Sequence, residues 1–204
     1  MKIICIGRNY AAHAAELNNP IPETPLIFMK PDTAVLKDNK AFYHPEFSTD
    51  IHHEIELVLR ICKPGKHIAV EFASKYYNQV TVGIDFTARD LQSDLKKKGQ
   101  PWEIAKAFDH SAVIGKFIPI SEAYKTDGEI EFSLLKNGAQ VQHGFSGQMI
   151  TSIDALISYV SQFFTLQTGD LIFTGTPKGV GQIKTGDLLE GFLGEQKLLS
   201  CEIK

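Results

Sequence analysis

The chain has 204 residues, of which 43% are hydrophobic and 22% are charged, with a formal net charge of −3 at pH 7. This length is enough for one sizeable hydrophobic core, so we expect a single domain over residues 1–204. A near-neutral chain lacks the basic surface of a nucleic-acid-binding protein, and no segment approaches the roughly 20 apolar residues of a membrane span, so we expect neither kind of partner.

The first half of the chain alternates strand and helix patterns. Short apolar or β-branched runs predict strands at 2–6, 26–29, 54–61 and 80–86. Helical patterns occur at 10–17, 70–77 and 89–98. The Asn18-Asn19-Pro20 stretch should end the first of these helices, and Gly99 should end the last.

The second half is richer in strands. Predicted strands at 129–136 and 140–145 flank Asn137-Gly138, which is the strongest short hairpin signal. Further elements are a helix at 153–164 and strands at 171–173 and 187–192. Because the order is irregular and the hairpins are antiparallel, the sequence predicts an α+β, strand-dominated fold rather than a βαβ repeat.

The cysteines and the N-terminus bear on the compartment. Cys5, Cys62 and Cys201 are far apart and form no CxxC or CxxH pattern, which argues against a disulfide framework and a thiolate zinc site. The apolar run 3–6 reaches Gly7-Arg8 at once and is too short for a signal peptide. We therefore expect a cytoplasmic protein.

A pair of glutamates is the most informative local feature. Residues two apart in a strand share a face, so Glu54 and Glu56 should lie side by side. They could both lie in water on an exposed edge, or they could bind a hard divalent cation, which prefers oxygen ligands. A zinc or iron site that includes His52 or His53 is a third possibility, although the two histidines point to alternate faces.

A third carboxylate favours the cation. Asp85 stands in the otherwise apolar run 81–87, where strand propensity and burial both disfavour aspartate. It could cap the following helix, but Thr87 is better placed to do so. Three carboxylates on one divalent ion would leave open coordination positions for water and for chelating substrate oxygens.

His13 and Glu16 form a second candidate pair. Three residues apart on a helix, they can touch, and a carboxylate beside an imidazole orients it as a general base. An ordinary surface pair has the same spacing. Lys106 lies among apolar residues and could be an exposed helix lysine or a buried cation that stabilises oxyanion charge. The glycine-rich stretch 175–181 lacks the ending of a P-loop, so we expect a tight turn or a backbone that approaches a small anion.

In combination, these motifs resemble the fumarylacetoacetate hydrolase family, in particular its small acylpyruvase-like and oxaloacetate-decarboxylase-like members. The matching segments occur in the family's order along almost the whole chain. They are Gly7–Tyr10 with His13 and Glu16, Phe28–Pro31, His53–Leu57, Gly83–Gln92, Lys106 and Thr174–Gly181.

The resemblance implies a mixed β-sandwich-like roll with a few flanking helices, a single catalytic domain and a homodimer. It implies that Glu54, Glu56 and Asp85 bind Mg²⁺ or Mn²⁺, and that His13 and Glu16 act as an acid–base dyad on a lid segment. Around a small 2-oxo acid substrate it places Lys106, Gln92, Thr176, Arg8 and Lys30.

The expected reaction follows from this resemblance. We expect hydrolysis of the C–C bond of 3-acylpyruvates or related 2,4-dioxo acids through a metal-bound pyruvate enolate, because an intact His–Glu dyad suits a water that must be activated. The same site could support oxaloacetate decarboxylation, or an isomerase or tautomerase reaction on a 2-hydroxy-dienoate or on oxaloacetate. A dicarboxylate-binding protein on the same scaffold is the non-enzymatic alternative.

Overall fold

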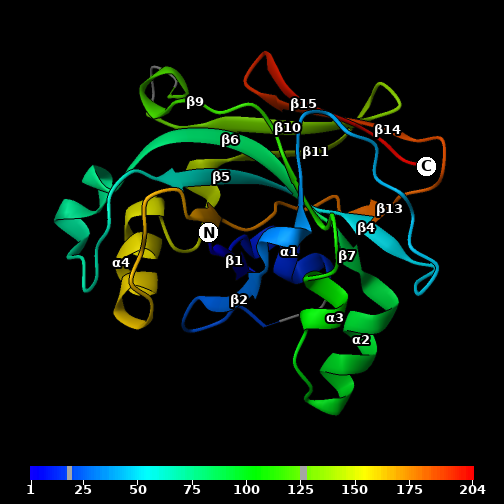
Figure 1. Cartoon of the computed structure of the whole chain (residues 1–204), viewed down its shortest axis with the longest axis horizontal. Coiled ribbons are helices and arrows are strands. Elements are labelled where there is room, and N and C mark those ends of the chain that lie inside the picture. Colours follow the sequence, from blue (N-terminus) through cyan, green and yellow to red (C-terminus); the bar gives the residue numbers. More distant parts are fainter. Residues whose placement is uncertain (18–19, 125–127) are drawn as a thin grey trace.

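The computed structural model describes residues 1–17, 20–124 and 128–204. The Asn18-Asn19 pair, expected to end the first helix, lies outside these described residues. Within them, the strands form an eight-stranded, a four-stranded and a three-stranded sheet. Figure 1 shows the long strands β5 and β6 across the middle of the molecule, with β10, β14 and β15 on one side and β1 and β2 on the other.

The largest sheet is mixed. Its order is β2-β1-β12-β5-β6-β8-β3, and β9 pairs with β6. The pairs β1·β12 and β3·β8 are parallel, whereas β5·β6 and the other neighbours are antiparallel. Its strands are β1 (Ile3–Gly7), β2 (Leu26–Lys30), β3 (Val35–Leu36), β5 (Ile55–Ile61), β6 (Tyr77–Asp85), β8 (Ala112–Ile114), β9 (Ile118–Pro119) and β12 (Leu171–Phe173).

The antiparallel second sheet packs on the first. Its order is β11-β10-β14-β15, with bounds Glu131–Lys136 for β10, Ala139–Phe145 for β11, Leu188–Leu193 for β14 and Gln196–Glu202 for β15. Gly191 lies where the sheets meet, since a Cβ there would come within 2.9 Å of Val82 Cγ2 and 3.3 Å of Ile55 Cδ1. This packing confirms the expected sandwich-like roll. A small sheet of β13 (Gly181–Gln182), β4 (Ile51–His53) and β7 (Thr87–Ala88) lies beside it.

Four α-helices flank the sheets in the part of the chain that is described. They are α1 (Ala11–Glu16), α2 (Arg89–Lys98), α3 (Glu103–Lys106) and α4 (Ile153–Phe163). Three-ten turns occur at Asp32–Ala34, Val70–Lys75, Ile120–Glu122 and Ser146–Gln148. The helical pattern expected at 70–77 thus forms a 3-10 helix over Val70–Lys75 instead of an α-helix. This stretch buries only Ala73, and its i→i+3 hydrogen bonds tighten it before Tyr77 enters β6.

Local turn chemistry was predicted well. Asn137 and Gly138 both have positive φ, 54° and 80°, as a type I′ hairpin turn requires. Gly99 ends α2 in the left-handed region with φ 64°. The last strand, β15, and the short helix α3 were not expected.

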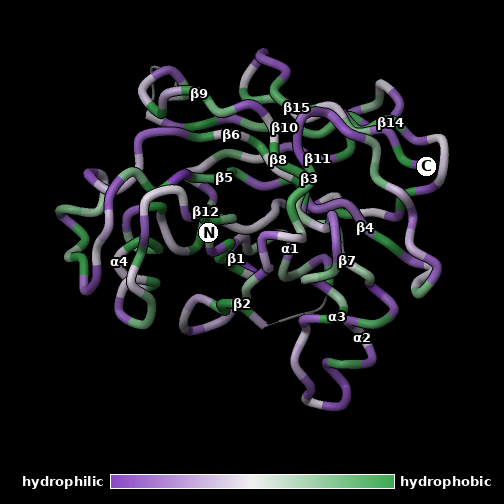
Figure 2. Tube along the Cα trace, in the orientation of Figure 1, coloured by the Kyte–Doolittle hydropathy of each residue, from purple (hydrophilic) through white to green (hydrophobic). Residues whose placement is uncertain are grey.

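The core lies between the two large sheets and beneath α4. Strand β5 is buried on both faces, with Ile55, Leu57 and Leu59 in the main apolar cluster. Figure 2 shows hydrophobic stretches along β5, β6 and β12 and hydrophilic ones at the outer end of α2. No helix among the described residues has the length and apolar character that crossing a membrane requires.

Candidate active site

Adjacent strands bring three carboxylates together at one end of the central sheet. Glu56 lies on β5 opposite Gly83, Glu54 immediately precedes β5, and Asp85 ends β6. The backbone N–H of Asp85 donates to the carbonyl of Glu54 at 2.8 Å. One oxygen from each carboxylate lies within 4.8 Å of the others, and all three side chains are buried. We call Glu54, Glu56 and Asp85 the carboxylate triad.

Three cations, the buried Lys30 and Lys106 and the partly buried Arg89, contact two members of the triad. Lys106 Nζ lies 2.8 Å from Glu54 Oε2 and 2.6 Å from Asp85 Oδ2, and Lys30 Nζ lies 2.7 Å from Asp85 Oδ1. The Arg89 guanidinium pairs with Glu54. Burial alone would raise the pKa of Glu54, but Lys106 and Arg89 hold it well below its usual range. Burial would lower the pKa of Lys106, but Asp85 and Glu54 outweigh it and raise that pKa.

Glu56 differs from the other two triad members, because among the described residues no ion pair offsets the cost of burying its charge. Its Oε2 accepts a 2.6 Å hydrogen bond from the Gly175 backbone N–H, and no ion pair to it is found among the described residues. Burial, followed by the nearby Asp85 carboxylate, raises the pKa of Glu56 well above its usual range. A divalent cation between the three carboxylates would supply the missing positive charge. The donor set, three buried carboxylates, is the kind that Mg²⁺ and Mn²⁺ prefer.

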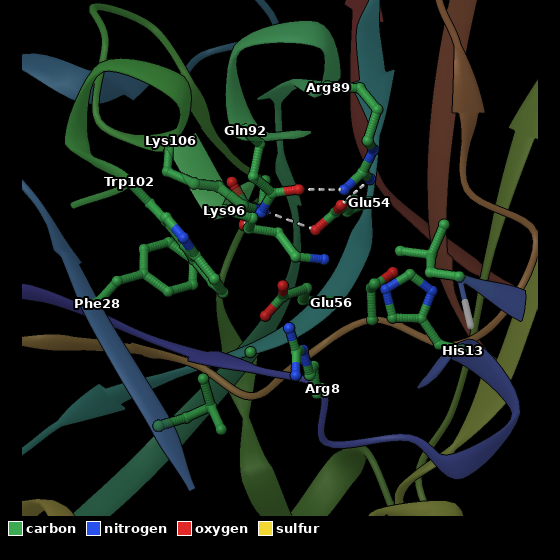
Figure 3. A pocket seen from close by; sticks show the side chains of 15 residues that line it. Arg8, His13, Phe28, Glu54, Glu56, Arg89, Gln92, Lys96, Trp102 and Lys106 are labelled. Atoms are coloured by element: carbon green, nitrogen blue, oxygen red, sulfur yellow. Dashed lines mark hydrogen bonds and ion pairs between the residues drawn. The ribbon is translucent and has the colours of Figure 1, made fainter. Parts of the chain in front are cut away.

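The triad opens into a small cavity of about 40 Å³. Arg8, with φ 58°, extends into it from the connection between β1 and α1 and points toward Glu56 (Figure 3). Phe28 and Trp102 form an aromatic wall, with ring centroids 6.2 Å apart. Further lining side chains are His13, Leu17, Arg89, Gln92, Lys96, Lys106 and Thr176. The cavity thus combines a charged floor with one apolar wall, which suits a small anion.

The expected His–Glu pair forms on α1. His13 Nδ1 lies 3.2 Å from Glu16 Oε2, and His13 is buried at the cavity whereas the Glu16 side chain is 32% exposed. The Gly179 backbone N–H donates to both oxygens of Glu16, at 3.0 and 3.2 Å. A carboxylate only accepts, so His13 Nδ1 donates, and in the neutral imidazole Nε2 is then the nitrogen with a free lone pair. We call His13 and Glu16 the dyad.

The residues expected around a substrate divide into two groups. Gln92 and Thr176 line the cavity, as does Arg8. Gln92 Oε1 accepts from Arg89 at 2.6 Å. Lys30 lies behind Asp85 with a fully buried side chain and also donates to Ser111 Oγ at 2.9 Å. It therefore holds Asp85 from the side away from the cavity.

The ammonium group of Lys106 is fully engaged. Its three hydrogens have acceptors in Glu54, Asp85 and the Thr87 hydroxyl, the last at 2.6 Å. Lys106 is 3% exposed, so it is the buried cation of the two possibilities. The expectation that Thr87 caps α2 is wrong, because Ala88 is the N-cap residue and makes no side-chain cap bond. Thr87 instead accepts from Lys106.

The two histidines before Glu54 lie outside the triad. His53 is buried, its Nδ1 is 3.0 Å from Gln142 Oε1, and burial lowers the pKa of His53 to about 4. His52 Nε2 contacts Asp50 at 3.0 Å. Neither histidine belongs to the group of possible metal ligands formed by the triad. The zinc or iron alternative therefore loses its support.

Sequence reasoning gave no role to Arg89, Gln142 or Gly179. Arg89 bridges Glu54 and Gln92, Gly179 contacts Glu16, and Gln142 links β5 to the loop that carries Thr176. Strand alternation alone would place Gln142 on the same face as the exposed Gln140, so the sequence held no signal for Gln142 either. The others depend on contacts between distant parts of the chain.

Known proteins match this chain over most of its length. The family model described as "Fumarylacetoacetate (FAA) hydrolase C-terminal" matches residues 2–203. The oxaloacetate tautomerase YcgM of Escherichia coli (strain K12) is 42% identical over 188 residues, which cover 92% of this chain and 86% of that protein. An oxaloacetate decarboxylase of Dictyostelium discoideum, described as mitochondrial, is 41% identical over 93% of this chain and 87% of its own length.

A solved structure extends the comparison to the fold. Fumarylpyruvate hydrolase from Pseudomonas aeruginosa, in complex with Mn²⁺ and pyruvate, superposes with a TM-score of 0.92 at 39% identity. The match covers 100% of this chain and 89% of that one. Relatives of this fold thus include tautomerases, decarboxylases and hydrolases.

Proposed function

Because the chain belongs to the fumarylacetoacetate hydrolase family, we propose that it is a divalent-metal-dependent enzyme that moves protons at C3 of a small 2-oxo acid. The reaction that we propose as its main activity is the keto–enol tautomerisation of oxaloacetate. The observation that carries the proposal is that His13, oriented by Glu16 behind it, lines the same small cavity as the carboxylate triad. The tautomerase relative from Escherichia coli supports the choice of reaction.

The triad would hold Mg²⁺ or Mn²⁺ through Glu54, Glu56 and Asp85. When bound, the cation would draw electron density from the 2-oxo group and so stabilise an enolate. The three carboxylates and their contacts Lys30, Arg89 and Lys106 cancel in charge. The loaded site would then carry two positive charges in addition to that of Arg8. This balance favours a dianion such as oxaloacetate.

The chain's own residues supply the proton transfers. His13 Nε2 takes a proton from C3 of the substrate and returns it to the oxygen of the 2-oxo group. Glu16 keeps the proton on Nδ1 and stabilises the imidazolium between these two steps. Gly179 holds Glu16 in place. Phe28 and Trp102 exclude water from one wall of the cavity.

Hydrolysis of 3-acylpyruvates is the second candidate. The fumarylpyruvate hydrolase with pyruvate supports it, because pyruvate is the product that such cleavage releases. The same dyad could activate a water. Lys106 gives it less support than we expected, because all three hydrogens of its ammonium already have acceptors and none is left for a tetrahedral oxyanion. Tautomerisation requires no such donor.

The test compares three reactions in one protein. Enol-to-keto conversion of oxaloacetate is followed by loss of enol absorbance, and pyruvate release is followed from acetylpyruvate and from oxaloacetate. Each of these three assays is run with Mg²⁺, with Mn²⁺ and with EDTA. The Glu16→Ala variant is assayed beside the wild type. Metal-dependent tautomerisation that falls in Glu16→Ala supports the proposal. Faster pyruvate release from acetylpyruvate would move the assignment to the hydrolase, and release from oxaloacetate would move it to the decarboxylase.

A further inference from the structure

A buried glutamine lies behind the cavity, on the second sheet. Gln142 of β11 is 1% exposed. Leu134 of β10 pairs with Gln142 but Leu135 pairs with Gln140, so Val141 is an extra residue and forms a β-bulge. Bulges redirect side chains, and this one accompanies a change from the exposed Gln140 to the buried Gln142.

The glycine-rich loop lies directly on this bulge. Gly179 has φ 98°, and a Cβ there would be 2.2 Å from the Val141 carbonyl oxygen. Gly144 of β11 likewise meets Pro177, with both Cβ and Cγ of the proline 3.0 Å from an added Cβ. The missing side chains let the loop approach β11 closely enough for the Gln142 amide to reach it.

Two backbone groups fix which end of the Gln142 amide is oxygen. The N–H of Ile55 donates to Oε1 at 3.0 Å, and Nε2 donates to the carbonyl of Pro177 at 3.0 Å. A backbone N–H can only donate and a carbonyl can only accept, so the amide cannot be reversed. It follows that His53 Nδ1 donates to Oε1, and that Thr176 Oγ1, 2.9 Å from Nε2, accepts.

This constrains the Thr176 hydroxyl. Because Thr176 Oγ1 accepts from Gln142, its own hydrogen is left to donate. Its acceptor in this structure is the Pro177 carbonyl at 3.5 Å, the long limit of a hydrogen bond, and that carbonyl also accepts from Gln142. Thr176 lines the cavity beside the triad. A closer anionic oxygen inside the cavity would therefore draw the hydrogen away from Pro177.

We propose that Gln142 is a positioning residue that turns the Thr176 hydroxyl into a hydrogen-bond donor toward an anionic oxygen of the bound 2-oxo acid. The proposal rests on the function proposed above. The same amide holds Ile55, which stands between Glu54 and Glu56, and Gly175 of the loop donates to Glu56. Gln142 thus also fixes the spacing between the triad and the Thr176 donor.

A double-mutant cycle tests whether Gln142 acts through Thr176. The variants are Gln142→Met, which keeps the side chain's length without its hydrogen bonds, Thr176→Val, which removes only the hydroxyl, and the pair together. The readouts are KM and kcat for oxaloacetate and the affinity of the Mn²⁺-loaded protein for pyruvate by calorimetry. Gln140→Met, on the exposed side of the bulge, is the matched control.

The donor contacts substrate and transition state alike, so KM should rise with little change in kcat. We expect pyruvate affinity to fall roughly tenfold or more in Thr176→Val, because the hydrogen bond is to a charged group, and about threefold to tenfold in Gln142→Met. The double variant should match Thr176→Val, and Gln140→Met should match the wild type.

Additive losses in the double variant, or an unchanged Gln142→Met, would overturn this proposal while an active wild type upheld the function. A wild type that neither binds pyruvate nor converts oxaloacetate would overturn the function and this proposal with it. Should Gln142→Met fail to fold, Gln142→Glu gives the same cycle. It keeps an acceptor for Ile55 and His53 but offers Thr176 an oxygen, which turns the hydroxyl away from the cavity and should raise KM at least as much.

Discussion

The carboxylate triad and the dyad segment (residues 8–17) face the same cavity but are held in different ways. The triad stands at the ends of β5 and β6, two long neighbours in the central sheet. Its side chains are buried, and Lys106, Lys30 and Arg89 fix two of the three. Its geometry is therefore a consequence of folding the core.

The dyad segment lies outside the sheets and is held by hydrogen bonds and by the side chain of Tyr10, which is buried in the core. Asn9 anchors its start through the Thr151 and Thr174 carbonyls at 3.0 and 2.9 Å, and Gly179 anchors Glu16 near its end. Between them lies the six-residue helix α1. A short helix outside the sheets opens at a smaller free-energy cost than a core strand. We therefore expect the dyad segment to open more easily than the triad strands.

The largest expected effect comes from breaking the triad. Asp85→Asn should lower activity roughly a thousandfold or more, because a ligand worth several kcal/mol of charge stabilisation is lost. Mn²⁺ affinity, measured by calorimetry, should fall with it. Asp94→Asn, on the exposed face of α2, is the control. Tight Mn²⁺ binding by Asp85→Asn would disprove the ligand assignment.

Metal-free stability should separate the triad members from one another. Asp85→Asn leaves Lys30 without its carboxylate partner and Lys106 with Glu54 alone, so the unfolding free energy should fall by about 3–5 kcal/mol. Glu56→Gln removes a buried carboxylate without a contacting cation and keeps an acceptor for Gly175, so metal-free stability should rise by about 1–3 kcal/mol. Denaturant unfolding in EDTA measures both. Equal losses would show that Glu56 is compensated after all.

Breaking the dyad should spare the metal. Glu16→Gln keeps an acceptor for the Gly179 N–H but loses the charge that orients His13. Turnover should fall by roughly a hundredfold to ten-thousandfold, the usual range for acid–base groups, while Mn²⁺ affinity stays unchanged. Glu23→Gln, an exposed neighbour in the chain, is the control. Unchanged turnover of both oxaloacetate and acetylpyruvate in Glu16→Gln would remove the dyad from the mechanism.

The difference between local patterns and long-range contacts explains which features could be predicted from the sequence. The spacing of Glu54 and Glu56, the misplaced Asp85 and the His13–Glu16 interval are local patterns, and the structure brings each set together. Whether those groups bind metal and transfer protons stays a prediction, as do the homodimer and the cytoplasmic location. Turn residues such as Gly138 were equally readable, because their backbone conformation depends on few neighbours.

Contacts between distant segments could not be predicted from local patterns. Lys106 reaches Glu54 across 52 positions, and Gln142 reaches Ile55 across 87. An exposed and a buried lysine look alike in sequence until the tertiary fold decides between them. The parallel pairing of β1 with β12 has the same origin, since it joins Ile3 to Leu171.

A smaller effect should come from the glycine that fixes the dyad. Gly179→Ala forces φ 98° on a residue with a Cβ and places that Cβ against Val141, so the loop must move away from Glu16. Gly186→Ala has nearly the same φ, 95°, but open space around it. The Gly186→Ala substitution should therefore lower stability by only about 1 kcal/mol and leave activity unchanged. Turnover of Gly179→Ala should fall roughly tenfold. Equal kinetics in the two variants would show that the Glu16 contact does not matter.

The smallest test uses thiols as reporters of rigidity and leaves activity untouched. Cys5 lies in β1 beneath the triad, and burial followed by the Asp85 charge raises its pKa. Burial raises the pKa of Cys201 to about 11. Both thiols should resist an aromatic disulfide reagent at pH 8, whereas the half-buried Cys62 should react readily. Denaturant should make all three thiols reactive.

Because Cys5 can react only when the central sheet opens, its labelling rate should follow global unfolding and should slow when Mn²⁺ is added. Fast labelling of Cys5 in the native protein would mean that the triad strands open as easily as the dyad segment, and the contrast between the two would fail.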